Sequence, residues 1–292
     1  MNAYLFPGQG TQFPGMGKDL YEKSKIAKEY FERGNDILGY SITDVMFEGS
    51  AEDLKQTKFA QPAIFLHSFI LAKTLGENFN PDMVAGHSMG EITALAAAGV
   101  LEFESALKLI SRRALSMQKV CEVKNTGMAV VVGLYDVIVK NVCDKIDGIV
   151  VPANYNAPNQ VVISGEKSAL EEACKKLRPG ARRIVYLPVS GAFHSPFMNP
   201  IVEEFRLAIE ETKFNNPKYP VYQNVTARPS NTIELIKKNL IDQLTHPVMW
   251  RHTILHMIED GATEFTEIGP GNFLKGLALQ IKKKFQKETL QK

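Results

Sequence analysis

The stretch AGHSMGEITALAAAG, residues 85–99, constrains the fold more than any other part of the sequence. The apolar segment before it, DMVAGHS, predicts a strand, and the helix formers that follow predict a helix. G-x-S-x-G spacing is typical of a sharp strand-to-helix corner, where Gly86 and Gly90 leave room for the backbone. Ser88 would then lie at the positive end of the helix, with the backbone N–H of Met89 aimed at the same place. The corner predicts a serine nucleophile beside half of an oxyanion hole.

Strand and helix patterns alternate along most of the remaining chain. Short strands are predicted within AYLFPGQG, PKYPVYQNVTARP and EFTEIGPG, with helical patterns between them. The alternation favours a short parallel sheet covered on both faces, in an α/β-hydrolase-like domain. Residues 125–190 instead follow the order β-α-β-β-α-β, the ferredoxin-like arrangement. We expect a large α/β catalytic domain from residues 1–124 and 191–292, with a small α+β domain inserted at 125–190.

Composition excludes several classes of protein. The chain has 292 residues, of which 45% are hydrophobic, and a formal net charge of +2, so neither nucleic acid nor a membrane surface is indicated as a partner. The start MNAYLFPGQG lacks a signal-peptide pattern, and no uncharged apolar run reaches about 18 residues. Cys121, Cys143 and Cys174 have no metal-ligand spacing. We expect buried free thiols in a cytoplasmic protein.

A serine nucleophile needs a base, and the histidines are the first candidates. His194 follows the predicted strand RRIVYLPVS and lies in a loop among small residues, where α/β folds place their sites. The others fall within an apolar helical pattern, beside the serine on the turn, in a loop before Pro247, or at a spacing that no third metal ligand completes. These other histidines are His67, His87, His246, His252 and His256.

One of two adjacent arginines is predicted to point inward. The helix that starts at Phe103 carries an apolar stripe at positions i, i+3, i+4 and i+7, and Arg113 belongs to that stripe. Arg112 belongs to the polar face. A desolvated guanidinium keeps its proton and needs an anion. Two interpretations stay open, an internal ion pair or a ligand carboxylate or phosphate.

Six motifs together resemble one family along essentially the whole chain. They are FPGQG, GHSMGE, RRALSMQ, ANYNAPNQVVISGE, GAFHS and QLTHPVMW, in this order. The sequence resembles the malonyl-CoA:acyl carrier protein transacylases and the related acyltransferase domains of fatty acid and polyketide synthases. That family also has the inserted ferredoxin-like domain.

The resemblance implies a role for each residue of a Ser-His dyad and its surroundings. Ser88 would be the nucleophile that takes the malonyl group, and His194 the general base and then the general acid. The backbone N–H groups of Gln9 and Met89 would form the oxyanion hole. A main-chain carbonyl at Gln243 would orient the histidine, so that no acidic third member is required.

The resemblance also implies how the substrate is recognised. Arg113 would bind the malonyl carboxylate through two N–H···O bonds. Phe193, before the histidine, resembles the residue of malonyl-selective members, although core packing is an alternative for this ring. The sequence departs from the family at Met89, where Leu or Ile is usual, and this change could alter the pocket's shape slightly.

The implied reaction is ping-pong acyl transfer in fatty acid synthesis, with malonyl-CoA and acyl carrier protein as partners. No metal, redox cofactor, nucleic acid or membrane is implied, and a monomer is expected. The basic tail IKKKFQK is either a docking aid for an acidic carrier protein or a solvated helix face.

Three alternatives stay open. A serine acyl hydrolase would use the same dyad, although α/β-hydrolases place the histidine late in the chain. A non-catalytic binding module could dispense with Ser88 and His194, which are both present. A stand-alone acyltransferase that serves a polyketide synthase would share all six motifs.

Overall fold

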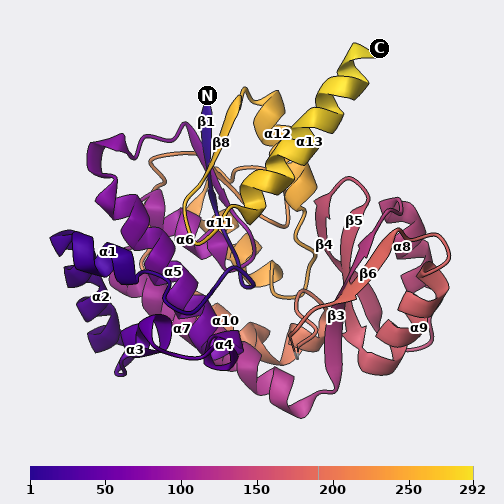
Figure 1. Ribbon diagram of the computed structural model, residues 1–292, viewed down its shortest axis with the longest axis horizontal. Helices are drawn as coiled ribbons and strands as arrows, with labels where there is room; N and C mark the ends of the chain where they lie inside the picture. The colour runs from indigo at the N-terminus through magenta and orange to yellow at the C-terminus, as the bar shows by residue number, and fades with distance from the viewer. Residues whose placement is uncertain (190, 292) are drawn as a thin grey trace.

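The computed structural model describes residues 1–189 and 191–291, which form a mixed α/β structure with one parallel and one antiparallel sheet (Figure 1). The parallel sheet has the order β7-β2-β1-β8. Its strands are β1 Asn2–Phe6, β2 Met83–Gly86, β7 Val221–Tyr222 and β8 Glu264–Glu267. The antiparallel sheet has the order β4-β5-β3-β6. Its strands are β3 Thr126–Val132, β4 Val150–Ala157, β5 Gln160–Glu166 and β6 Arg183–Tyr186.

The helices fall into three groups along the chain. Those before the antiparallel sheet are α1 Lys18–Lys23, α2 Lys25–Leu38, α3 Ile42–Phe47, α4 Ala51–Lys55, α5 Thr57–Thr74, α6 Gly90–Ala97 and α7 Phe103–Val123. Those connecting its strands are α8 Asp136–Cys143 and α9 Lys167–Leu177. Those after it are α10 Asn199–Glu211, α11 Ile233–Asp242, α12 Trp250–Glu259 and α13 Phe273–Leu290. None of these helices, within the described ranges, is both long and apolar enough to cross a bilayer.

Alternation along β1 explains why helices cover the parallel sheet on both faces. Ala3 and Leu5 belong to a core cluster that includes Trp250 of α12 and residues of α13. Tyr4 and Phe6 point the other way, into a larger cluster with residues of α2, α5, α6 and α7. A strand with two apolar faces is stable only when both are buried. The predicted parallel sheet is therefore confirmed.

The antiparallel sheet also has two different faces. Ala129, Val131 and Ile163 pack against α8 and α9 in a core cluster of their own. The opposite face carries Met128 and Val130 of β3, which line a cavity shared with the large part of the molecule. Figure 1 shows this sheet, with α8 and α9 outermost, beside the parallel sheet and its helices. Residue 190, the predicted boundary of the inserted segment, lies outside the described residues.

Candidate active site

The corner between β2 and α6 depends on glycine at both ends of G-x-S-x-G. A Cβ at Gly86 would lie 1.8 Å from the carbonyl oxygen of Gly90, and a Cβ at Gly90 would lie 2.2 Å from the carbonyl oxygen of Phe6. Ser88 adopts a positive φ of 54°, which a residue other than glycine rarely does. Such strain persists only where the surroundings impose it, and here it places the hydroxyl at the N-terminal end of α6.

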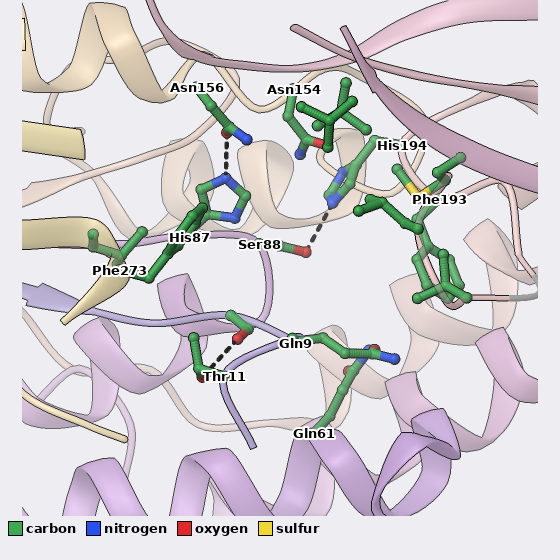
Figure 2. A pocket seen from close by; sticks show the side chains of 18 of the residues that line it. Gln9, Thr11, Gln61, His87, Ser88, Asn154, Asn156, Phe193, His194 and Phe273 are labelled. Atoms are coloured by element: carbon green, nitrogen blue, oxygen red, sulfur yellow. Dashed lines mark hydrogen bonds between the residues drawn. The ribbon is translucent and has the colours of Figure 1, made fainter. Parts of the chain in front are cut away.

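Ser88 and His194 form a hydrogen-bonded pair (Figure 2). Ser88 Oγ lies 2.8 Å from His194 Nε2, and His194 Nδ1 lies 2.8 Å from the main-chain carbonyl oxygen of Gln243. Because a carbonyl only accepts, Nδ1 carries the proton and leaves Nε2 free to accept the serine proton. His194 is 4% exposed, and its burial, together with the Arg113 charge, lowers its pKa to about 3. The imidazole is therefore neutral at physiological pH and can act as a base.

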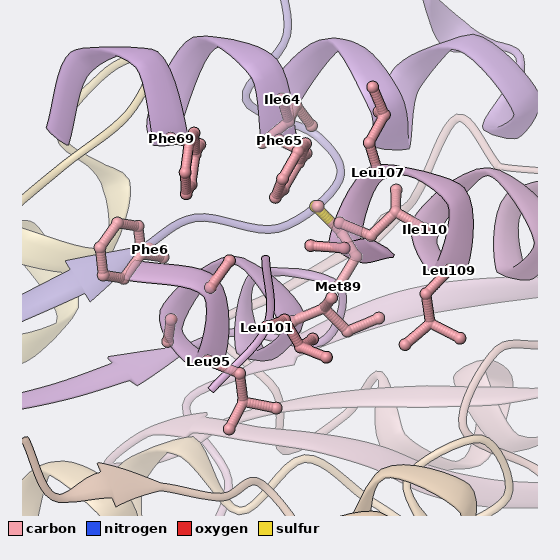
Figure 3. Close-up of a cluster of buried hydrophobic side chains, with 14 of the residues drawn as sticks. Phe6, Ile64, Phe65, Phe69, Met89, Leu95, Leu101, Leu107, Leu109 and Ile110 are labelled. Carbon is pink, nitrogen blue, oxygen red and sulfur yellow. The ribbon is translucent and has the colours of Figure 1, made fainter. Parts of the chain in front are cut away.

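The two predicted oxyanion donors have free backbone N–H groups. Among the described residues, neither the N–H of Gln9 nor that of Met89 has a hydrogen-bond partner. The Gln9 segment passes close to the corner, since a Cβ at Gly8 would lie 2.5 Å from the carbonyl oxygen of His87. The Met89 side chain does not line the cavity but packs into the hydrophobic core between α5 and α7 (Figure 3). This position explains how the residue can vary without a direct effect on the pocket.

Arg113 is buried at the nucleophile without a carboxylate partner in contact. Its side chain on α7 is 1% exposed. Nη1 donates to Gln61 Oε1 at 2.8 Å, and Nη2 donates to Ser88 Oγ and to Gln243 Oε1, each at 3.2 Å. Burial lowers the pKa of Arg113 to about 10, so the guanidinium stays charged at neutral pH. Its bonds go to neutral oxygens, and no ion pair of Arg113 is found in the described part of the chain.

Arg112 behaves as its place on the polar face predicts. It forms an exposed ion pair with Glu211 of α10, with Nη1 and Oε2 2.8 Å apart. The periodicity of the sequence therefore separates the two arginines correctly, and the interpretation of Arg113 as half of a direct internal ion pair is wrong for the described residues.

A cavity of about 480 Å³ leads to the Ser88–His194 pair. Phe193 lines it beside His194 (Figure 2). Arg113 does not itself line the cavity, but Ser88 and Gln61, which it contacts, do. Apolar side chains of α7, of the antiparallel sheet and the segment after β6, and of α13 form much of the cavity wall. They are Met117, Met128, Val130, Val162, Leu187, Val189, Phe273 and Leu274. The polar side chains of the lining include Gln9, Thr11, His87, Asn154, Asn156 and Gln160.

The family model described as Acyl transferase domain matches residues 3–286. The chain belongs to the acyl transferase family. The match covers every predicted site residue and nearly all of both sheets, and it confirms the acyltransferase resemblance inferred from the six motifs.

Individual relatives of this acyl transferase are similar over more than nine-tenths of their length. A malonyl CoA-acyl carrier protein transacylase of Staphylococcus aureus is 38% identical over 293 residues, covering 99% of this chain and 95% of the relative. One from Bacillus subtilis is 38% identical over 289 residues, covering 97% and 91%. A solved structure of PlMCAT, a malonyl-transacylase in complex with AntF, its type II PKS acyl-carrier protein, has a TM-score of 0.93 at 35% identity, covering 96% of this chain and 92% of that chain.

Several polar residues of this acyl transferase site were not predicted. Asn224 Oδ1 accepts the backbone N–H of Ser88 at 2.7 Å, and Asn224 Nδ2 donates to the carbonyl oxygen of Gly86 at 2.7 Å. Asn224 therefore holds both sides of the corner. It lies beyond β7 in a segment whose sequence predicts only a strand, so no local signal identifies it.

His87 turns away from the nucleophile, as expected for neighbours on a sharp turn. Its Nε2 lies 2.8 Å from Asn156 Oδ1 of β4, and Figure 2 shows the two rings of His87 and His194 on different sides of Ser88. Burial lowers the pKa of His87 to about 4, so this imidazole is also neutral. His87 and Asn156 join the corner to the antiparallel sheet.

The cysteines are free and buried, as the sequence predicts. Burial raises the pKa of the Cys121 thiol to about 11 and that of Cys143 to about 12, so both are protonated at neutral pH. Neither they nor Cys174 line the cavity.

Proposed function

We propose that this acyltransferase moves the malonyl group of malonyl-CoA to the phosphopantetheine thiol of an acyl carrier protein, in fatty acid synthesis. The observation that carries the proposal is the buried Arg113 guanidinium, bonded to neutral oxygens and 3.2 Å from the Ser88 hydroxyl. A buried cation at this place fits a substrate that carries a carboxylate better than one with an uncharged acyl group. The names of the similar transacylases point to the same substrate.

Acylation of Ser88 follows from the geometry of the dyad. His194 Nε2 takes the hydroxyl proton as Ser88 Oγ attacks the thioester carbonyl carbon. The main-chain carbonyl of Gln243, bonded to Nδ1, stabilises the imidazolium that forms. The N–H groups of Gln9 and Met89 hold the negative oxygen of the tetrahedral intermediate. The C–S bond then breaks, and the sulfur of coenzyme A leaves with the proton from His194.

The second half-reaction reverses these roles with a different thiol. The phosphopantetheine thiol of the carrier protein gives its proton to His194 and attacks the malonyl ester. Collapse of the second tetrahedral intermediate returns the proton to Ser88 and releases the malonyl thioester. The reaction is ping-pong, because coenzyme A must leave the cavity before the carrier arm enters.

The substrate carboxylate takes the place of weaker partners on Arg113. A bidentate carboxylate bonds a guanidinium more strongly than the neutral oxygens of Gln61 and Gln243 do. Phe193, in the cavity wall beside His194, limits the space for a substituent on the malonyl carbon. Both roles are proposals that follow from position and chemistry.

We further propose that residues 125–190 form a ferredoxin-like domain inserted into an α/β-hydrolase-like domain of residues 1–124 and 191–292. The element order β3-α8-β4-β5-α9-β6 and the separate core of this segment support the division.

Transfer is tested by following where the malonyl group goes. Purified chain is incubated with malonyl-CoA, with and without holo acyl carrier protein, and free malonate and malonyl-carrier protein are measured by mass spectrometry. We expect rapid formation of malonyl-carrier protein and slow release of malonate. Rapid release of malonate without the carrier would instead indicate the serine acyl hydrolase.

A further inference from the structure

Glu91 of α6 is a buried carboxylate that the mechanism does not use. It is 0% exposed. Its Oε1 accepts from Gln223 Nε2 at 3.0 Å, and its Oε2 accepts from the backbone N–H of Asn224 at 2.7 Å and from Gln243 Nε2 at 2.9 Å. Burial raises its pKa to about 7, while these hydrogen bonds and the Arg113 charge lower it. Every direct contact is a donor, so each of these hydrogen bonds favours the ionised form of the carboxylate against the effect of burial.

Glu91 is the charged member of the group of acceptors that orient the Gln243 amide. Gln243 Nε2 donates to Glu91 Oε2 at 2.9 Å, to the carbonyl oxygen of Ser88 at 3.1 Å and to Asn224 Oδ1 at 3.3 Å. The amide oxygen is thereby left for Arg113 Nη2, which only donates, at 3.2 Å. If the amide turned over, its NH₂ group would face the guanidinium and its oxygen would face the carboxylate. Both contacts would then be repulsive.

We propose that Glu91 is a positioning residue of the malonyl site, acting through the side-chain amide of Gln243. This inference rests on the proposed function, because it assigns Arg113 to the substrate carboxylate. Glu91 holds the amide so that its oxygen faces Arg113, while the main-chain carbonyl of the same residue holds His194. One buried carboxylate thus orients the amide that contacts the cation assigned to the substrate carboxylate.

The amide between Glu91 and Arg113 also keeps the guanidinium available. A carboxylate in direct contact would form an ion pair with Arg113 and compete with the substrate carboxylate. The Gln243 amide instead lies between the two charges and presents only its neutral oxygen to Arg113. A substrate carboxylate can displace that oxygen. Glu91 supplies negative charge near Arg113 without forming a direct ion pair with it.

Glutamine cannot replace Glu91 without a conflict between donors. If the side-chain oxygen of a glutamine at position 91 accepts from the backbone N–H of Asn224, its NH₂ group faces Gln223 Nε2, which is also a donor. Gln223 cannot turn its own amide, because its Oε1 already accepts from Asn239 Nδ2 at 2.9 Å and from Ser230. If the NH₂ group faces the other way, it meets the N–H of Asn224 and Nε2 of Gln243.

The test is a double-mutant cycle with two substrates. Glu91→Gln, Gln243→Met and the double variant are assayed for kcat/KM with malonyl-CoA and with acetyl-CoA. Each single change should lower the malonyl-to-acetyl ratio by roughly ten- to a hundredfold, as expected when a hydrogen bond to a charged group is lost. The double variant should be about as impaired as the worse single one, because both changes act on the same contact between Glu91 and Gln243.

Asn239→Ala is the matched control, because the Asn239 side chain belongs to the same buried polar cluster but bonds only Gln223 and Ser230. The bond from the backbone N–H of Gln243 to the Asn239 carbonyl oxygen is kept in this variant. It should lower the melting temperature and leave the substrate ratio unchanged. Multiplying effects in the double variant, or equal losses for both substrates in Glu91→Gln, would overturn the proposal. If Glu91→Gln does not fold, Gln243→Met decides, since an unchanged ratio in that variant removes the link to Arg113. Failure of the proposed function is distinguishable, because Arg113→Ala would then leave the ratio unchanged in an otherwise wild-type chain.

Discussion

Ser88 Oγ lies between a base and a cation. His194 Nε2 is 2.8 Å away and accepts the proton, and Arg113 Nη2 is 3.2 Å away and donates to the same oxygen. The positive charge of Arg113 helps to keep His194 neutral before substrate arrives, because it disfavours a second cation nearby. If Arg113 binds the substrate carboxylate as proposed, that negative charge reduces this effect and makes His194 a better proton acceptor once the acyl group is bound.

Arg113→Ala tests carboxylate recognition. Removal of the guanidinium leaves the malonyl carboxylate buried without a partner, at a cost of roughly 2–5 kcal/mol, so kcat/KM for malonyl-CoA should fall by about 30-fold to several thousand-fold. Transfer from acetyl-CoA should be unchanged or faster, since acetyl offers no carboxylate to Arg113, which keeps its neutral partners in the wild type. Arg113→Lys should recover little, because a lysine cannot make the two-pronged contact. Equal losses for both substrates would contradict this role.

His194→Ala tests the base. Acylation by malonyl-CoA, followed by rapid-quench mass spectrometry, should slow by roughly 100-fold to 10,000-fold, the usual contribution of a positioned general base. His67→Ala is the comparison, because His67 is buried in α5 and does not line the cavity. The assignment is wrong if His67→Ala slows acylation as much as His194→Ala does.

The elements of the fold act on the site through a few close approaches of backbone. The corner between β2 and α6 passes against the end of β1, where the Phe6 and Pro7 carbonyl oxygens lie next to Gly90. Asn224 reaches the corner because β7 is only Val221–Tyr222. The segment PKYPVYQNVTARP predicts a longer strand, but Pro220 lacks an N–H and Ala227 turns the chain with a φ of 56°. The early end of β7 frees Gln223 and Asn224 to bind Glu91.

Two glycine-to-alanine changes compare the corner with an ordinary helix position. A Cβ at Gly90 would lie 2.2 Å and 2.7 Å from backbone oxygens that cannot move independently. Gly90→Ala should therefore lower the free energy of unfolding by at least about 2 kcal/mol. Gly276 lies within α13 with no atom within 4 Å of its added Cβ, so Gly276→Ala should stabilise the chain by roughly 0.5–1 kcal/mol. Urea denaturation of both variants checks the pair. Equal stability of Gly90→Ala and the wild type would show that the corner tolerates a side chain.

At the scale of the whole molecule, local sequence patterns predicted the strands, the helices and the Ser88 corner. They did not predict the residues that hold Ser88 in place. The strand-Ser88-helix corner and the inward Arg113 follow from spacing and periodicity, because both depend on residues within one element. Asn224 and the side chain of Gln243 reach Ser88 from more than 130 residues away in the chain. Their neighbours are set by tertiary packing, and a polar residue in a loop carries no local mark of such a role.

Because three histidines are buried in their neutral form, the stability of the folded chain depends on pH. Burial lowers the pKa values of His67 and His87 to about 4 and that of His194 to about 3, from the ordinary 6.5. The unfolded chain binds these protons below pH 6.5 and the folded chain does not, so stability falls as pH decreases from 6.5 to 4. Glu91, whose pKa is raised to about 7, opposes this trend with a single proton.

Urea denaturation at pH 7, 6 and 5 checks the sign. The free energy of unfolding should fall with decreasing pH, by about 1.4 kcal/mol per pH unit for each net proton taken up on unfolding. His67→Leu should reduce that slope by about one proton, because it removes one buried neutral imidazole. A free energy of unfolding that rises toward pH 5 would show that these histidines are protonated in the folded chain.

Peptide mass spectrometry after brief incubation with malonyl-CoA tests the malonyl-serine intermediate most directly. The wild type should carry a malonyl group on the peptide that contains Ser88, and the group should disappear when holo acyl carrier protein is added. Ser88→Ala should fold, because alanine fits the same turn, and should carry no adduct while the circular dichroism spectrum stays unchanged. A malonyl adduct that persists in folded Ser88→Ala, or a wild type that never acquires one, would contradict the account.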